Sequence, residues 1–139
     1  MKYMEIDKFN DYKLVKDFFS IFNKKKIKIF FKTKNIPEYE ELITIIKDIN
    51  KFNPDLIISA GGGSVLDYAK IANVLYVSNS LREDISNSEY KLIKPNRKLL
   101  AIPTTAGSGA EVTTNAVIYI NNVKYSIEGD LIKPDFYFL

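Results

Sequence analysis

The sequence contains no cysteine, no histidine and no tryptophan among its 139 residues. The lack of cysteine excludes a disulfide framework, a thiolate metal site and a cysteine nucleophile. The lack of histidine removes the commonest general base and the commonest protein ligand of zinc and iron. A transition-metal site built from this chain would therefore have carboxylates as its only ionised ligands.

Other absences narrow the class of protein further. No apolar run approaches the roughly 18 residues that a membrane-spanning helix needs, and the start, "MKYMEIDKFNDYK", is too polar for a signal peptide. The net charge is only +3, from 20 basic and 17 acidic residues, and the lysines are spread along the chain. These features predict a soluble cytoplasmic protein that binds neither nucleic acid nor membrane.

Hydrophobic periodicity predicts that helices and strands alternate along the chain. Helical spacing covers residues 11–23, 38–52 and 64–78, and residues 79–97 are polar with room for a short helix. Strands are expected at 26–31, 55–60, 98–105 and 134–139, and a hairpin at 116–127 turns at Asn121 and Asn122. Helices between buried, continuously apolar strands indicate an α/β fold with a parallel sheet and right-handed crossovers. We expect residues 27–31, 55–60 and 99–103 to form neighbouring strands.

A glycine-rich loop, "GGGS", links the strand at 55–60 to the helix that follows it. Glycines at a helix start allow a phosphate to approach the backbone, where amide groups and the helix dipole favour negative charge. Gly62, Gly63 and Ser64 are therefore placed to hold a phosphate or pyrophosphate, and Ser64 is also a candidate helix cap. Asp67 suits the first turns of the helix and could bind a sugar hydroxyl. The motif alone is equally typical of a tight turn.

A second polar loop, "TTAGSGAEVTTN" at 104–115, follows the next strand. It contains five threonine or serine hydroxyls, two glycines, a glutamate and no bulky apolar side chain, which is unusual for a simple connection. Loops at the carboxyl ends of adjacent parallel strands share one edge of a sheet, where such folds bind ligands. Together the two loops favour a shared ligand site over two unrelated turns.

The runs "DLIISAGGGSVLDYAKIANVLY" and "LLAIPTTAGSGAEVTTNAVI" strongly resemble the iron-containing, or group III, alcohol dehydrogenases of the dehydroquinate-synthase-like fold. The resemblance extends from about residue 11 to 139, and "PTTAGSGAEVT" favours this branch over dehydroquinate synthase and glycerol-phosphate dehydrogenase. It implies a Rossmann-like domain that binds NAD or NADP and a reaction that interconverts small aldehydes and alcohols. Carried over residue by residue, it assigns cofactor contacts to Gly62, Gly63, Ser64, Asp67, Thr104, Thr105, Ser108, Thr113 and Lys124.

The chain also departs from the pattern of that family. The family's helical C-terminal domain, whose aspartate and histidines hold iron or zinc, has no counterpart here, so no metal ligand or catalytic residue is assigned. Only ten residues precede the helix at 11–23, and we expect the family's first strand, with the loop that meets the adenosine ribose, to be missing. The turn "NIP" at 35–37 matches the family loosely.

Residues 1–139 are therefore expected to form a single, incomplete dinucleotide-binding domain. The predicted function is the NAD(P)-binding portion of a metal-dependent alcohol dehydrogenase, inactive alone, whose hairpin resembles members that reduce phosphonoacetaldehyde or similar polar aldehydes. The alternatives are a non-catalytic nucleotide-binding remnant and one subunit of a split enzyme. Apolar faces that the family buries elsewhere predict a homo-oligomer or a missing C-terminal domain as partner.

Overall fold

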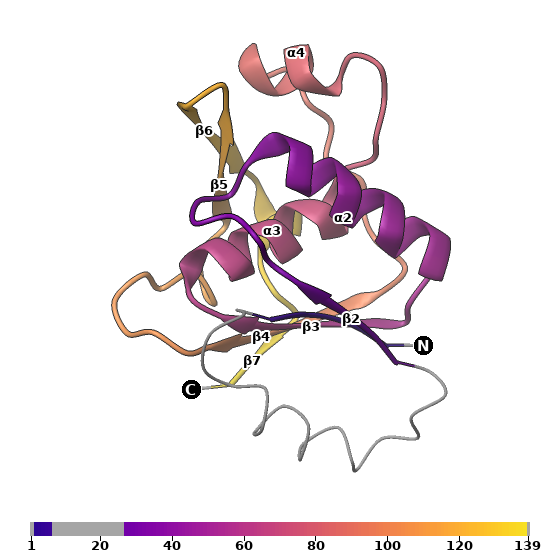
Figure 1. Cartoon of the computed structure of the whole chain (residues 1–139), viewed down its shortest axis with the longest axis vertical. Helices are drawn as coiled ribbons and strands as arrows, with labels where there is room; N and C mark the ends of the chain where they lie inside the picture. The colour runs from indigo at the N-terminus through magenta and orange to yellow at the C-terminus, as the bar shows by residue number, and fades with distance from the viewer. Residues whose placement is uncertain (1, 7–26, 139) are drawn as a thin grey trace.

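The computed structural model describes residues 2–6 and 27–138. Its central feature is a parallel five-stranded sheet in the order β2-β1-β3-β4-β7 (Figure 1). The strands are β1 (Lys2–Ile6), β2 (Ile27–Phe31), β3 (Leu56–Gly61), β4 (Lys98–Pro103) and β7 (Phe136–Tyr137). This confirms the α/β, Rossmann-like class. The order matches the flavodoxin-like variant of doubly wound sheets, in which ligands bind beyond the carboxyl ends of the strands.

Strand β1 corrects two expectations from the sequence. It pairs with β2 through Lys2↔Ile27 and with β3 through Lys2↔Leu56, so the strands at 27–31 and 55–60 are not neighbours. A first strand is also present, although we expected the chain to lack one. "KYMEI" includes two charged residues and does not have the continuous apolar pattern of β3. Its strand conformation comes from pairing on both edges, a tertiary effect that local propensity does not report. The predicted pairing of residues 55–60 with 99–103 is confirmed.

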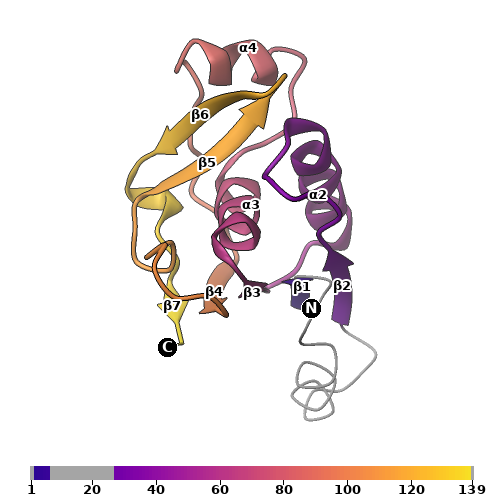
Figure 2. The ribbon, with the colours of Figure 1, turned by 60° about the vertical axis from the view of Figure 1, so that its left-hand side comes forward.

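Two helices, α2 (Tyr39–Phe52) and α3 (Gly63–Val74), cover one face of the sheet (Figure 2). Helix α2 ends as expected, at Asn53, whose φ of 47° is left-handed and whose N–H donates to Ile49 O at 2.8 Å. Helix α3 ends at Val74, four residues before the predicted end at 78. There the Val74 carbonyl accepts the N–H of Ile93 at 2.9 Å, which ties the following excursion back to the helix.

The excursion at 79–97 contains the expected short helix, α4 (Leu81–Ser86). The helix predicted at 11–23 lies outside the described residues. No helix in the described part of the chain is long and apolar enough to cross a membrane.

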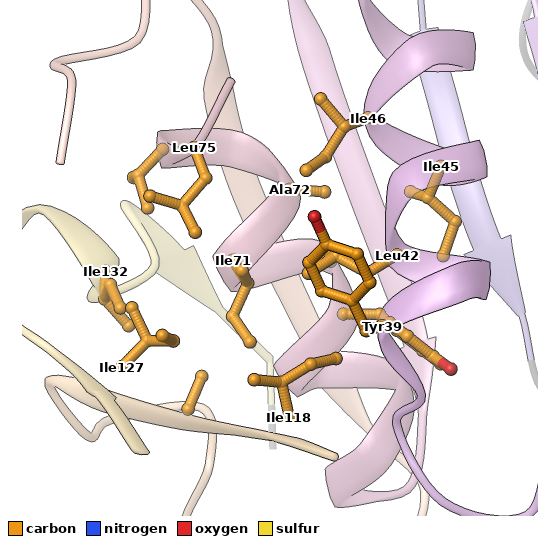
Figure 3. Packing of buried hydrophobic residues seen from close by; sticks show 14 of the residues in the cluster. Tyr39, Leu42, Ile45, Ile46, Ile71, Ala72, Leu75, Ile118, Ile127 and Ile132 are labelled. Atoms are coloured by element: carbon orange, nitrogen blue, oxygen red, sulfur yellow. The ribbon is translucent and has the colours of Figure 1, made fainter. Parts of the chain in front are cut away.

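The main core lies between α2, α3 and the hairpin, above the sheet (Figure 3). Isoleucines dominate it, and branched apolar side chains from both helices interdigitate with those of the hairpin. Its centre includes Leu42, Ile45, Ile46, Ile71, Ile118 and Ile127, all of them with no exposed surface. Tyr68 is also fully buried, and its hydroxyl accepts the N–H of Glu38 at 2.5 Å, just before α2 begins. This packing fixes the position of α3 relative to α2 and therefore fixes the loop that precedes α3.

The hairpin consists of β5 (Asn115–Ile120) and β6 (Val123–Glu128), as predicted for residues 116–127. Its turn residues, Asn121 and Asn122, have φ of 50° and 65°. A two-residue turn with positive φ at both positions matches the twist of the strands it joins, and asparagine tolerates it. After the short 3-10 helix η2 (Asp130–Ile132), β7 is shorter than the strand predicted at 134–139.

The hairpin turn yields a stability prediction. Asn122→Val should lower the free energy of unfolding by about 1–2 kcal/mol, because a β-branched residue is strained at positive φ. Asn122→Gly should leave it unchanged or raise it, since glycine adopts this conformation readily. Chemical denaturation of both variants and the unaltered chain measures the difference. Equal stability of the two variants would contradict the turn geometry.

Candidate functional site

The glycine-rich loop lies at the carboxyl edge of the sheet, directly beyond β3. Gly61 ends the strand, Gly62 is the residue before α3, with φ −74° and ψ 178°, and Gly63 is the first residue of the helix. No side chain caps α3, so the expectation that Ser64 does so is wrong. Ser64 lies within the first turn instead, and its hydroxyl accepts a hydrogen bond from Lys32 Nζ at 2.7 Å. The first amides of α3 are therefore left to interact with an anion.

The second polar loop touches the first. The N–H of Thr104 donates to Gly61 O at 3.0 Å, continuing the pairing of β4 with β3 beyond the ends of the strands. A Cβ atom added to Gly62 would lie 3.3 Å from Thr105 Oγ1, and one added to Gly63 would lie 3.2 Å from Ser108 Cβ. The two loops predicted to share an edge are thus in van der Waals contact. A side chain at either glycine would press on the second loop.

The hydroxyls of the second loop form an exposed group beside the first loop and a group toward β5, which includes Thr113. Thr104, Thr105 and Ser108 are exposed on the side of the first loop. Gly107 and Gly109, on either side of Ser108, have φ of 108° and 61°, which lets the backbone reverse sharply there. The exposed hydroxyls can donate to, or accept from, a bound molecule that lies along both loops.

Lys70 holds the far end of the second loop. Its side chain is 1% exposed, and its Nζ donates to Ala110 O at 2.9 Å, Thr113 Oγ1 at 2.9 Å and Asn115 O at 2.5 Å. Burial lowers the pKa of Lys70 to about 8, while the carboxylates of Asp67 and Glu111 oppose this shift. All three ammonium donors are used, so Lys70 fixes the loop to α3.

Thr113 was predicted to contact the cofactor, and the structure engages its hydroxyl elsewhere. It accepts from Lys70 and donates to Asn115 O at 3.3 Å, which uses its single donor. Sequence reasoning missed Lys70 itself. The available signal was a lysine one helical turn after Leu66, on the face that packs inward.

Asp67 lies one turn into α3, half-buried between the helix and the hairpin. Burial raises its pKa to about 6, and the Lys70 ammonium, the Val117 backbone N–H and the Lys124 ammonium pull it back down. Lys124, exposed on β6, is thus near enough to act on Asp67 electrostatically. The structure therefore places Asp67 and Lys124, both predicted site residues, near each other.

Lys32 is a second residue that sequence reasoning missed. It directly follows β2, is 8% exposed, and reaches Ser64 on α3. Its neighbour Thr33 is fixed by Glu41 on α2, whose Oε1 accepts from both the backbone N–H and the hydroxyl of Thr33 at 2.7 Å. A lysine immediately after the short strand predicted at 26–31 was the signal that could have identified it.

The residues of this edge match those of a known family. The family described as "Iron-containing alcohol dehydrogenase" matches residues 6–139. The chain belongs to the iron-containing alcohol dehydrogenase family. This confirms the family resemblance drawn from "GGGS" and "PTTAGSGAEVT".

Curated members of the family show the same relationship at the sequence level. An alcohol dehydrogenase of Thermococcus barophilus is 38% identical over 106 residues, covering 72% of this chain and 28% of that protein. A 4-hydroxybutyrate dehydrogenase of Clostridium kluyveri is 37% identical over 124 residues, covering 84% of this chain and 32% of that protein. The chain therefore spans about a third of the length of these relatives.

Solved structures of the family share the fold. A sulfoacetaldehyde reductase of Bifidobacterium kashiwanohense, in complex with NAD+, superposes with a TM-score of 0.84 at 23% identity, covering 98% of this chain and 37% of that one. An iron-containing alcohol dehydrogenase of Thermococcus thioreducens superposes with a TM-score of 0.79 at 24% identity, covering 98% and 39%. At this identity the likeness supports the fold of the chain alone.

Iron, the metal that gives the family its name, does not suit the residues of this site. The sequence has no histidine or cysteine, and the described residues include no group of three potential metal ligands. The two loops and the first turns of α3 contain only two carboxylates, Asp67 and Glu111. A transition-metal site needs about three protein ligands. The two loops therefore lack the ligands that would hold iron.

The raised pKa of Asp67 predicts a pH-dependent effect on stability. An acid whose pKa is higher in the folded state than its ordinary 3.8 is destabilising when ionised, so its cost is absent near pH 4 and complete above about pH 6. Asp67→Asn should therefore stabilise the fold at pH 7.5, by up to about 3 kcal/mol, with the gain disappearing toward pH 4. Denaturation curves at both pH values provide the measurement. A gain independent of pH would show that burial of the carboxylate is not the cause.

Proposed function

We propose that this chain is the NAD(P)-binding part of an alcohol dehydrogenase or aldehyde reductase that acts on a small polar aldehyde. The observation that carries the proposal is the contact between the two loops beside the uncapped start of α3. An extended dinucleotide needs a phosphate site and, next to it, polar groups for the rest of the molecule. The uncapped start of α3 and the exposed hydroxyls of the adjoining loop support both roles.

Each part of the edge has a role in this proposal. Gly62 and Gly63 admit the pyrophosphate to the amides of α3, and the Ser64 hydroxyl donates to it. The remainder of the dinucleotide lies along the hydroxyls of Thr104, Thr105 and Ser108. Asp67 flanks it from α3 and Lys124 from the hairpin.

Thr113 supports the loop rather than the ligand, because Lys70 and Asn115 occupy its hydroxyl. The bound nicotinamide cofactor supplies the hydride.

The substrate class rests on the family and on the names of similar proteins. Those names include a 4-hydroxybutyrate dehydrogenase and a sulfoacetaldehyde reductase, both pointing to short polar substrates. We assign no residue of this chain to the substrate. The second candidate function, a nucleotide-binding module without catalysis, is favoured by the absence of histidine and cysteine from the whole sequence.

Exposed apolar residues at the β7 edge support a further chain or domain as partner. Phe136 and Phe138 are 55% and 70% exposed, and Tyr137 between them is 48% exposed. Exposed aromatic side chains at the edge of a sheet favour a partner that covers them in the assembled protein.

Titration with NADH and NADPH tests the nucleotide site. Gly63→Val should reduce binding by at least tenfold, because its side chain occupies the pyrophosphate approach and presses on Ser108, 3.2 Å from the Cβ position. Thr44→Ala, on the exposed side of α2, is the control and should bind as the unaltered chain does. Calorimetry gives the affinities and circular dichroism the folded state. Equal affinity in the Gly63→Val variant and the unaltered chain would contradict the proposal.

The chain by itself should not reduce aldehydes. The family's metal polarises the carbonyl oxygen in the reaction, and this chain has neither histidine nor cysteine to hold one. The measurement is NADH consumption with short aldehydes, with iron or zinc added, on purified chain. Turnover above background that disappears in Gly63→Val would show that a metal-free or carboxylate-only mechanism operates.

A further inference from the structure

We propose that Lys32 is a phosphate-binding residue of the nucleotide site, an inference that rests on the proposed function. Lys32 stands at the carboxyl end of β2, and its Nζ reaches across the sheet edge to Ser64 Oγ at 2.7 Å. It thereby brings a positive charge to the first turn of α3. The helix dipole and the "GGGS" amides favour negative charge at the same place.

The environment of the ammonium group is unusual for a structural lysine. Lys32 is 8% exposed, yet none of the ion pairs between described residues involves it. Its partners are the Ser64 hydroxyl and, at a long 3.4 Å, the carbonyl oxygen of Asn35. An ammonium group has three donors, so at least one remains for another acceptor. A buried cation without a counter-charge is costly, and a bound phosphate would remove that cost.

The surroundings hold Lys32 in place rather than neutralising it. Glu41 on α2 contacts the neighbouring Thr33, and its Oε1 accepts from the backbone N–H and the hydroxyl of that residue. The other oxygen, Oε2, is buried without a hydrogen-bond partner and forms no ion pair with Lys32. Lys34, two residues on, is instead exposed and paired with Glu38 at 3.3 Å. The two lysines of one turn thus have different roles, and Lys34 is a matched control.

The position of Lys32 fits either of two phosphate groups of a dinucleotide. The pyrophosphate would lie on the "GGGS" amides, where the Ser64 hydroxyl can bridge it to Lys32. The 2′-phosphate of NADP, attached to the adenosine ribose, would lie toward β1 and β2, the strands on the Lys32 side of β3. Both groups are phosphate esters that accept charge-assisted hydrogen bonds, and ligand comparison separates them.

The test compares Lys32→Met, which keeps length and removes the charge, with Lys34→Met. Calorimetry measures NADH, NADPH, ADP-ribose and adenosine binding to each variant and to the unaltered chain. Lys32→Met should lose about tenfold or more in affinity for the phosphorylated ligands and nothing for adenosine, and Lys34→Met should change neither. Equal losses for NADH, NADPH and ADP-ribose identify the pyrophosphate, and a loss confined to NADPH identifies the 2′-phosphate.

Stability supplies a second readout that separates binding from structure. If Lys32 serves phosphate binding, Lys32→Met should melt at the same temperature as the unaltered chain or higher, because an uncompensated buried charge is removed. A lower melting temperature together with unchanged affinity for NADH and NADPH would overturn the inference and make Lys32 a structural residue. The inference would also be overturned if Lys32→Met binds NADH and NADPH as tightly as the unaltered chain does while Gly63→Val has lost binding.

The proposed function can fail separately. If the folded, unaltered chain binds no dinucleotide, the proposed function fails, and titration with inorganic pyrophosphate then decides the inference. Pyrophosphate binding that Lys32→Met weakens and Lys34→Met does not would uphold the assignment of Lys32. Pyrophosphate binding that is absent, or equal in all three proteins, would reject it.

Discussion

The buried ammonium of Lys70 is the interaction on which the edge of this sheet depends. From the middle of α3 it donates to a carbonyl and a hydroxyl of the loop between β4 and β5 and to the carbonyl of the first residue of β5. That loop contains two glycines at positive φ and has few apolar anchors. Without a central donor, its carbonyl groups would turn toward water and the hydroxyls near the glycine loop would lose their positions. Lys70 thereby fixes the loop as one wall of the proposed nucleotide site.

Close approach of two backbones is the second constraint. Gly62 and Gly63 leave only enough space for the second loop to pass, since an added Cβ would lie within 3.3 Å of Thr105 or Ser108. Gly61 is tighter still, because its Cβ would lie 2.7 Å from Val65 Cγ2 on α3. The three glycines therefore do more than permit a turn. They allow strand, helix and neighbouring loop to converge on one place where backbone amides face outward.

The same edge concentrates charges in unfavourable surroundings. Lys32 and Lys70 are buried, and burial raises the pKa of Asp67 to about 6 and lowers that of Lys70 to about 8. A chain selected for stability alone would place apolar residues at such positions. The main core is largely isoleucine, leucine and alanine, and Asn73 and Arg97 are buried polar residues outside this edge. The charges buried at this edge support the proposal that it is the functional part of the molecule.

The sequence by itself determined the α/β class, the hairpin with its Asn121–Asn122 turn, and the contact between the two polar loops. These follow from local periodicity, from turn chemistry and from the rule that parallel strands end at one edge. Tertiary structure alone decided that "KYMEI" is a central strand, because its backbone is satisfied by partners on both sides. It also decided the roles of Lys32 and Lys70, whose contacts with Ser64 and with the second loop join residues 32 to 45 positions apart. Contacts over such separations depend on how helices pack on the sheet, which no local pattern encodes.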